Sequence, residues 1–165
     1  MKGALSNRQD GFTLLELLIV MAIVAILAGI AAAALNRTIR NNQIAEGAQA
    51  LAASFQSARN SSQRDSTGAV IAWAGTGTNQ SFSSYTVTRG SQIRTQGLPT
   101  GIIAKCVLLG TLTACGTNSL SYNAPYAEVT NGAIFQVSHS TDTGARPLFV
   151  KVGGVTGKVI VSESQ

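Results

Sequence analysis

The sequence predicts an α+β protein in which one long N-terminal helix precedes an antiparallel β-rich head. Residues 17–35 carry no charge and are largely apolar, and apolar residues continue at helical spacing to about residue 64. From residue 69 onward the pattern changes to two-residue alternation, interrupted by Gly, Ser, Thr and Asn. The 165 residues therefore have room for one membrane helix and one soluble domain.

Residues 1–11 form a polar leader that contains Lys2, Arg8 and Asp10. A secretory signal peptide has its small-residue cleavage site after the apolar stretch. In this sequence the small residue, Gly11, comes before the apolar stretch. Cleavage after Gly11 would therefore leave the apolar helix on the mature protein, with a new amine at Phe12.

Residues 12–35 are long enough to cross the roughly 30 Å hydrocarbon core of a bilayer as a helix. Glu16 is the one charged side chain in this segment. A carboxylate costs about 2.5–3.5 kcal/mol at the bilayer centre and less near the surface, and it normally has a partner. Glu16 either pairs with a positive group or complements the helix dipole at the headgroups, and the first interpretation is favoured.

The run GFTLLELLIV at residues 11–20 closely resembles the N-terminal signature of type IV pilins and type II secretion pseudopilins. The resemblance implies cleavage after Gly11 by prepilin peptidase, N-methylation of Phe12, and a filament built by stacking the apolar helices. It also implies that Glu16 pairs with the N-terminal amine of a neighbouring subunit. Such a pair is strong at low dielectric, and removing one partner leaves the other unpaired.

The same resemblance implies a single-pass inner-membrane protein with its head in the periplasm. From there the subunit would enter a pilus, which reaches the cell surface, or a secretion pseudopilus. The implied partners are other pilin or pseudopilin subunits, prepilin peptidase, the inner-membrane assembly platform and membrane lipid.

Residues 36–66 are predicted to continue the same helix with an amphipathic pattern. Apolar side chains recur there at helical spacing, at Ile44, Ala48, Leu51, Phe55 and Ala58. We expect this stripe to pack on a sheet, and we expect the helix to end before Gly68.

Residues 67–165 are predicted to form the β-rich head. Its candidate strands are residues 69–74, 83–89, 101–109, 119–123, 133–138, 148–152 and 156–162. Gly153 and Gly154 indicate a tight hairpin between the last two strands. Gly157, inside the last strand pattern, indicates a bulge or a close backbone approach.

Cys106 and Cys115 are the only cysteines. A head that faces an oxidising periplasm favours a disulfide between them, across a loop that contains Gly110. The alternative is two buried free thiols.

The C-terminal third resembles the ending of the GspH/FimT family of minor pilins and pseudopilins. The residues that carry this resemblance are AIFQV at 133–137, Gly144, LFVKV at 148–152 and GKVIV at 157–161. Heads of that family have two sheets packed on the C-terminal half of the long helix, so two sheets are implied here. The family's last strand often carries Gly-Arg-x-Arg, whereas this chain has Lys158 at the first basic place and Ile160 at the second.

Basic residues near that last strand are associated with DNA binding in competence-type members of the family. After Leu35 this chain has ten basic and five acidic residues, which are dispersed rather than clustered. Because phosphate binding needs clustering, a solvated surface is favoured over a DNA site. The candidate DNA-binding residues are Arg89, Arg94, Arg146, Lys151 and Lys158.

The aromatic side chains of the head are expected to be sheet core rather than stacking platforms for single-stranded nucleic acid. They are Trp73, Phe82, Tyr85, Tyr122, Tyr126, Phe135 and Phe149.

The sequence contains no pattern of catalytic residues. His139 is the only histidine, and the residues around it offer no nucleophile, so a surface or hydrogen-bonding role is favoured over catalysis. Two cysteines with one histidine do not make a zinc site. We therefore expect no enzymatic activity, no cofactor and no bound metal.

Together these observations predict a minor pilin or pseudopilin subunit that assembles through its N-terminal helix. Two alternatives remain open. One is a pilus-associated DNA-binding minor pilin that serves DNA uptake in natural transformation. The other is a major pilin that forms the body of the fibre.

Overall fold

The computed structural model describes residues 13–75, 81–107, 115–130, 132–142 and 144–164. The chain divides into two compact units, Met1–Thr38 and Ile39–Gln165, which are described separately. One helix, α1 (Leu14–Asp65), supplies residues to both units. It begins two residues after and ends one residue before the predicted range 12–66.

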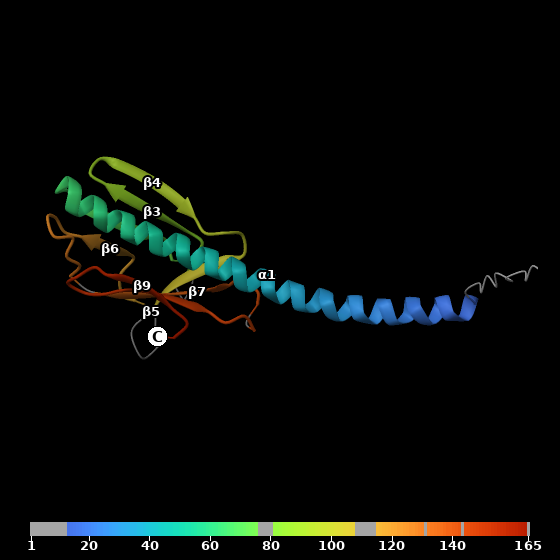
Figure 1. Ribbon diagram of the computed structural model, residues 1–165. Helices are drawn as coiled ribbons and strands as arrows, with labels where there is room; N and C mark the ends of the chain where they lie inside the picture. Colours follow the sequence, from blue (N-terminus) through green and yellow to red (C-terminus); the bar gives the residue numbers. More distant parts are fainter. Residues whose placement is uncertain (1–12, 76–80, 108–114, 131, 143, 165) are drawn as a thin grey trace, which may run out of the picture. The chain divides into compact units, whose positions relative to one another are not determined.

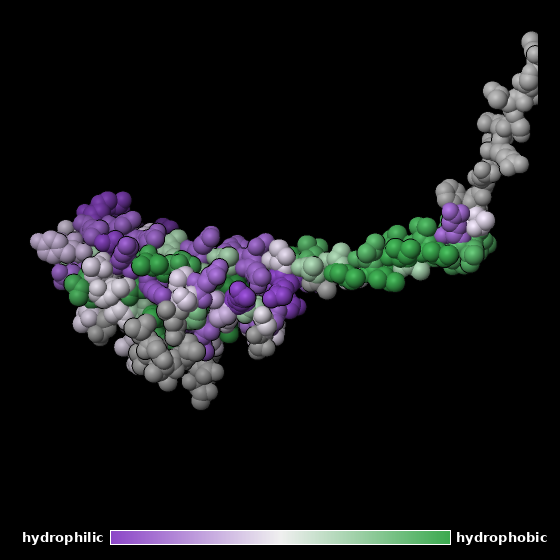
Figure 2. All heavy atoms as spheres, turned by 60° about the horizontal axis from the view of Figure 1, so that its bottom comes forward, coloured by the Kyte–Doolittle hydropathy of each residue, from purple (hydrophilic) through white to green (hydrophobic). Residues whose placement is uncertain are grey.

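In the first unit, α1 presents apolar side chains to solvent all round. From Leu14 to Leu35 every side chain that the structure describes is exposed, and the surface of this stretch is almost uniformly apolar (Figure 2). A helix that is hydrophobic on all faces needs an apolar environment around its whole circumference. This segment therefore needs lipid or other protein around it.

The second unit contains two antiparallel sheets beside the rest of α1 (Figure 1). Sheet A has the strand order β4 (Gln92–Gly97), β3 (Ser84–Arg89), β1 (Ala69–Trp73) and β6 (Ser119–Tyr122). Its burial alternates along β1, where Ala69, Ile71 and Trp73 are buried, because successive strand residues point to opposite faces.

Sheet B has five strands, which are also antiparallel to their neighbours. Their order is β2 (Ser81–Phe82), β5 (Ile102–Val107), β7 (Ala133–His139), β8 (Leu148–Val152) and β9 (Val159–Ser162). A single residue, Ser83, separates β2 of sheet B from β3 of sheet A. The two sheets predicted for the head are thus present.

The core lies between α1 and the two sheets. All five apolar residues of the predicted helix stripe, from Ile44 to Ala58, are buried. The Phe55 ring on α1 lies 4.9 Å from the Phe135 ring on β7, measured between centroids. At Gly47 the helix approaches sheet B so closely that an added Cβ would lie 2.8 Å from Ile102 Cγ2.

The aromatic residues of the head are buried with one exception. The Trp73 ring centroid lies 5.0 Å from that of Phe135 and 5.7 Å from that of Phe82. Six of the seven aromatic residues predicted as core are buried, whereas Tyr126 is 74% exposed. Burial leaves these six rings unavailable as stacking platforms for nucleic acid.

The loop between β8 and β9 differs from the prediction. The last strand begins at Val159 rather than at residue 156, so a six-residue loop, 153–158, replaces the predicted tight hairpin. Gly153 N–H donates to Lys158 O at 2.8 Å across this loop. Gly157 lies in the loop rather than in a strand, with φ of 60°.

The close backbone approach predicted at Gly157 is nevertheless confirmed. An added Cβ would lie 2.8 Å from Tyr122 Cε1 and 2.9 Å from Ala127 O. Glycine is therefore required by both its positive φ and its contacts.

Strand β4 was not predicted, because all six of its residues are exposed and its sequence, QIRTQG, has no apolar alternation. The short strand β2 was missed as well. Strand β5 is described as far as Val107, and residues 108–114, which include the end of the predicted 101–109 strand, lie outside the described residues.

Candidate functional site: an apolar helix with one carboxylate

Thr13 caps the start of α1. Its Oγ1 accepts a hydrogen bond from the Glu16 backbone N–H at 3.2 Å, and its carbonyl oxygen accepts one from Leu17 N–H at 3.2 Å. These contacts place Thr13 at the N-cap and Glu16 three residues later, the spacing of a capping box. This motif was readable in the sequence as Thr-x-x-Glu and was missed there.

Glu16 lies in the first helical turn, where the helix dipole favours a negative charge. Its side chain is exposed and has no ion-pair partner among the described residues. The other two predicted processing residues, Gly11 and Phe12, lie outside the described part of the chain. The carboxylate is therefore free to meet a positive group from elsewhere.

The apolar stretch from Leu14 to Leu35 spans about 33 Å at 1.5 Å per residue, close to the thickness of a bilayer core. Within the described residues, α1 is the one helix long and apolar enough to cross a membrane. Glu16 is its sole charge between residues 14 and 35.

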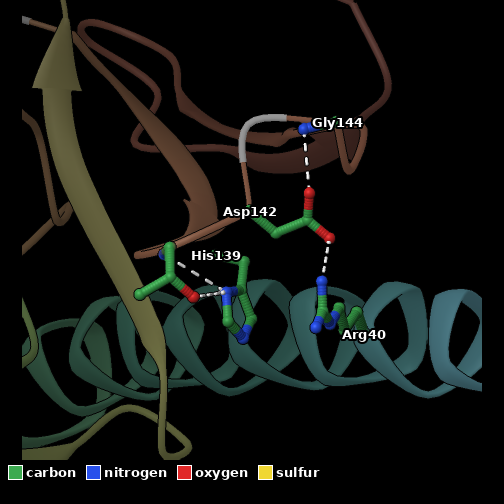
Figure 3. Close-up of polar contacts among 5 residues, drawn as sticks. Arg40, His139, Asp142 and Gly144 are labelled. Atoms are coloured by element: carbon green, nitrogen blue, oxygen red, sulfur yellow. Dashed lines mark hydrogen bonds and ion pairs between the residues drawn. The ribbon is translucent and has the colours of Figure 1, made fainter.

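A salt bridge ties the β7–β8 loop to the start of the head's part of α1. Arg40 Nη1 donates to Asp142 Oδ2 at 2.6 Å, and the other oxygen, Oδ1, accepts Gly144 N–H at 2.9 Å (Figure 3). The Arg40 hydrogen bond, together with that from Gly144, holds the pKa of Asp142 below its ordinary value. Asp142, in the segment between β7 and β8, is thus anchored to the helix.

Two of the five candidate DNA-binding residues lie together on sheet A. Arg89 on β3 and Arg94 on β4 line a cavity of about 260 Å³, here called the hairpin pocket. Its full lining is Ser57, Val87, Arg89, Gln92, Arg94 and Gln96. Sequence reasoning missed Ser57, Gln92 and Gln96, because their proximity depends on the unpredicted strand β4.

Two others, Lys151 on β8 and Lys158 in the β8–β9 loop, lie together beside sheet B. Lys151 and Lys158 line a groove of about 520 Å³ whose other walls include Val107, Ile134 and Ile160. Arg146 is exposed in the segment before β8 and lines neither hollow. The five residues are therefore distributed over two hollows and a loop rather than gathered in one basic surface.

Cys106 on β5 and Cys115 are joined by a disulfide. Cys115 N–H also donates to Cys106 O at 3.1 Å. Both residues are buried, and Cys106 faces the main core of the head. The bond thus joins the end of β5 to the segment that precedes β6.

Two comparisons with known proteins bear on this arrangement. Residues 6–32 match the family model described as the prokaryotic N-terminal methylation motif. The fold is similar to that of the type IV minor pilin FimU of Pseudomonas aeruginosa, with a TM-score of 0.55 and 13% identity, covering 73% of this chain and 89% of that one. The chain is type IV pilin-like. No curated protein matches its sequence.

The motif of this pilin-like chain covers the capped first turn, Glu16 and most of the apolar stretch. The similarity to FimU concerns the fold: one long helix on two antiparallel sheets. An apolar N-terminal helix with a methylation motif fits a membrane-anchored pilin.

The single histidine of this pilin-like chain packs at the edge of the β7–β8 loop. His139 Nδ1 lies 3.2 Å from Thr141 Oγ1 and accepts Thr141 N–H at 3.3 Å. On its other side, a Cβ added at Gly101 would lie 3.0 Å from Nε2. Within the described ranges, no three His, Cys, Asp or Glu side chains lie close enough to hold a metal ion.

Proposed function

We propose that this chain is a minor pilin or pseudopilin subunit that assembles into a filament through α1. Prepilin peptidase would cut after Gly11, and Phe12 would become the methylated N-terminus of the mature protein. The observation that carries the proposal is the exposed apolar stretch from Leu14 to Leu35 with Glu16 as its only charge. The proposed role is structural, without catalysis or a cofactor.

Burial of the apolar stretch would stabilise the subunit both in the membrane before assembly and in the filament afterwards. Each fully buried Leu, Ile, Val or Met side chain contributes about 1.5–3 kcal/mol relative to exposure in water. The large exposed residues of the stretch are Leu14, Leu15, Leu17, Leu18, Ile19, Val20, Met21, Ile23, Val24, Ile26, Leu27, Ile30 and Leu35. Lipid covers them before assembly, and neighbouring helices cover them in the filament.

Glu16 gives this packing a register. Apolar side chains alone specify little about the axial position of one helix against the next. An amine at Phe12 of one subunit and the Glu16 carboxylate of its neighbour would attract strongly in an apolar surrounding, because the effective dielectric is low. A subunit inserted at the wrong height would leave both charges unpaired, which is costly.

The small residues Gly29 and Ala31 to Ala34 favour close approach of neighbouring helices in this proposal. Among the described residues, apart from its chain neighbours and the backbone of its own helical turns, no atom lies within 4 Å of a Cβ added at Gly29. Small residues allow helix backbones to pack closely where no hydrophobic driving force distinguishes lipid from protein. The head, held beside α1 by its core and by the Arg40–Asp142 pair, would contact other subunits or cargo.

Mass spectrometry of the mature N-terminus tests the proposal. The full-length chain is expressed with its own membrane machinery, and protein is extracted from membranes and from sheared surface fibres. We expect an intact mass that begins at Phe12 and carries one methyl group. Assembled protein that retains residues 1–11 would contradict the proposal.

A Gly11→Val variant is the control, because a bulky β-branched residue replaces the small residue before the cut. We expect this variant to keep the leader and to remain in the membrane.

The location of the parent protein distinguishes the two kinds of filament. Detection of the parent in sheared fibres places the subunit in a pilus, and restriction to the cell envelope places it in a pseudopilus. A minor subunit would be scarce relative to the main fibre protein, whereas a major pilin would dominate the fibre.

A further inference from the structure

The β3–β4 hairpin presents a row of polar side chains to α1. Val87 pairs with Arg94 and Arg89 pairs with Gln92, so these four residues share one face of sheet A. That face is turned toward α1, because Tyr85 and Arg89 hydrogen-bond to Ser54 and Ser57 of the helix. The hairpin pocket defined above therefore lies between α1 and the β3–β4 hairpin, whose strand β4 forms the outer edge of sheet A. The hairpin runs beside α1 (Figure 1).

The pocket carries positive charge without a carboxylate of its own. Its lining has two guanidinium groups and no acidic residue. Arg89 Nη2 donates to Ser57 Oγ at 2.8 Å, whereas Arg89 Nε is buried without a hydrogen-bond partner in the part of the chain that the structure describes. A buried donor without an acceptor is costly, and an anion within reach of Nε would offset that cost.

The charge of Arg89 lowers the pKa of one acid, Asp65, whose carboxylate is already hydrogen-bonded to other residues. Its carboxylate accepts hydrogen bonds from Arg64 Nε at 2.9 Å and from Ser61 Oγ at 3.0 Å. The Arg64 hydrogen bond is the main cause that holds the pKa of Asp65 below its ordinary value, and the charge of Arg89 is a minor one. Asp65 therefore leaves the guanidinium of Arg89 largely uncompensated.

Two further lining residues, Gln96 and Ser57, offer hydrogen-bond donors. The Gln96 Oε1 atom accepts from Tyr85 Oη at 2.9 Å and lies 2.5 Å from Ser54 Oγ, so its amide N–H₂ is left for a ligand. Ser57 Oγ already accepts from Arg89, which leaves its own proton to donate. Val87 is the one apolar residue in the lining.

We propose that the hairpin pocket binds a phosphate group, held by the guanidinium groups of Arg89 and Arg94 with donors from Ser57 and Gln96. Guanidinium groups match the oxygens of phosphate in bidentate geometry. The tetrahedral anion also offers oxygens to donors that arrive from two strands and a helix, which a planar carboxylate offers less well. The pocket neither depends on assembly nor includes any residue of the apolar stretch.

The phosphate can come from two sources, a free phosphate or a phosphodiester of nucleic acid. Arg89 and Ser57 also line a second, larger hollow of about 790 Å³ along α1, together with Arg64, Asn60 and Gln63. A single strand of nucleic acid, which carries several phosphates, would use both hollows, whereas inorganic phosphate would need only the hairpin pocket.

Calorimetric titration of the full-length mature protein in non-ionic detergent at low salt tests the proposal. One arm titrates inorganic phosphate, and the other titrates a single-stranded DNA oligonucleotide. Arg94→Gln is the main variant, because Arg94 is exposed and its loss leaves the fold intact. Arg89→Gln is the second variant, and a thermal melt checks that it remains folded.

We expect each variant to weaken phosphate binding about tenfold or more, the loss typical of one charge-assisted contact. Arg146→Gln is the matched control, because it removes the same charge from an exposed site outside the pocket, and it should leave phosphate binding unchanged. Oligonucleotide binding that is much tighter and steeply salt-dependent identifies nucleic acid as the source of the phosphate. Equal affinity for both ligands identifies free phosphate.

Absence of phosphate binding would overturn the proposal. An equal loss in the Arg146→Gln control would also overturn it, because that result indicates general surface charge. Binding that survives both Arg94→Gln and Arg89→Gln would place the phosphate elsewhere.

Discussion

Tyr122 and Arg59 each have a buried polar atom without a hydrogen-bond partner among the described residues. Tyr122 has no exposed surface, and its hydroxyl has no partner among the described residues. Arg59 Nε is likewise buried and unpartnered within the described ranges. Burial raises the pKa of Tyr122 to about 12, and the charge of Arg59 opposes this rise.

The first prediction concerns alkaline stability. Because the pKa of Tyr122 in the folded state exceeds the ordinary value of 10.0, its contribution to stability is complete below pH 10 and is lost as pH rises toward about 12. We expect Tyr122→Phe to melt at or above the parent temperature at neutral pH, since the lost hydroxyl makes no hydrogen bond. We also expect it to lose less stability between pH 10 and 12.

Thermal melts followed by circular dichroism across this pH range provide the measurement. Tyr126→Phe is the control, because Tyr126 is 74% exposed and should leave the alkaline loss unchanged. A parent-like alkaline loss in Tyr122→Phe would show that another group causes it.

Asp142 supports a second prediction at the acid end. The pKa of its carboxyl lies below the ordinary value of 3.8, first because of the Arg40 hydrogen bond. Its contribution to stability is therefore present above that value and is lost as pH falls through the folded-state pKa. We expect Asp142→Asn to melt slightly lower than the parent at neutral pH and to lose less stability as the pH falls below 3.8. Glu128→Gln is the control, because Glu128 is an exposed acid far from Asp142 in sequence, and its melting temperature should follow that of the parent across this pH range. If the parent and Asp142→Asn lost stability identically in acid, the Asp142 carboxylate would not contribute to acid stability.

Among the elements, those with a regular apolar pattern were the ones that the sequence predicted well. The stripe from Ile44 to Ala58 and the strand 148–152 were located correctly, because their burial follows the 3.6-residue and two-residue periods. Strand β4 is an exposed edge whose partner is β3 alone, so hydrogen bonding rather than burial maintains it. The hydrophobic pattern of the sequence therefore does not predict such a strand.

The loop 153–158 shows a second limit. Val155 and Thr156 continue the β-branched composition of the last strand, but Gly157 must pass beside Tyr122, which lies 35 residues earlier in sequence. Tertiary packing thus decides where β9 begins. The hairpin pocket was unpredictable for the same reason, since it combines β4 with α1.

The disulfide gives a prediction at the scale of elements. The two cysteines are nine positions apart. Breaking a disulfide that closes a loop of this length lowers the free energy of unfolding of the protein by about 2–3 kcal/mol. We expect reductant to lower the stability of the mature protein in urea by this amount. The double variant Cys106→Ala/Cys115→Ala should be insensitive to reductant, and a parent protein equally stable with and without reductant would contradict the prediction.

At the scale of the whole molecule, assembly depends on residues that are contiguous in sequence. The leader, Gly11, Phe12 and Glu16 form one short motif, so the sequence alone predicted the candidate assembly site. The proposed partner of Glu16 belongs to another subunit, and one chain cannot contain that contact. The central claim therefore requires a measurement on filaments.

That measurement is the fraction of the protein found in sheared filaments for the parent, Glu16→Gln and Glu46→Gln. Glu46 is the matched control, because it is an exposed glutamate on the same helix but outside the apolar stretch. Removing one partner of a buried ion pair costs about 3–5 kcal/mol, or more than a hundredfold in affinity. The account predicts that Glu16→Gln stays in the membrane while Glu46→Gln assembles like the parent, and it is contradicted if Glu16→Gln enters filaments as efficiently as the parent.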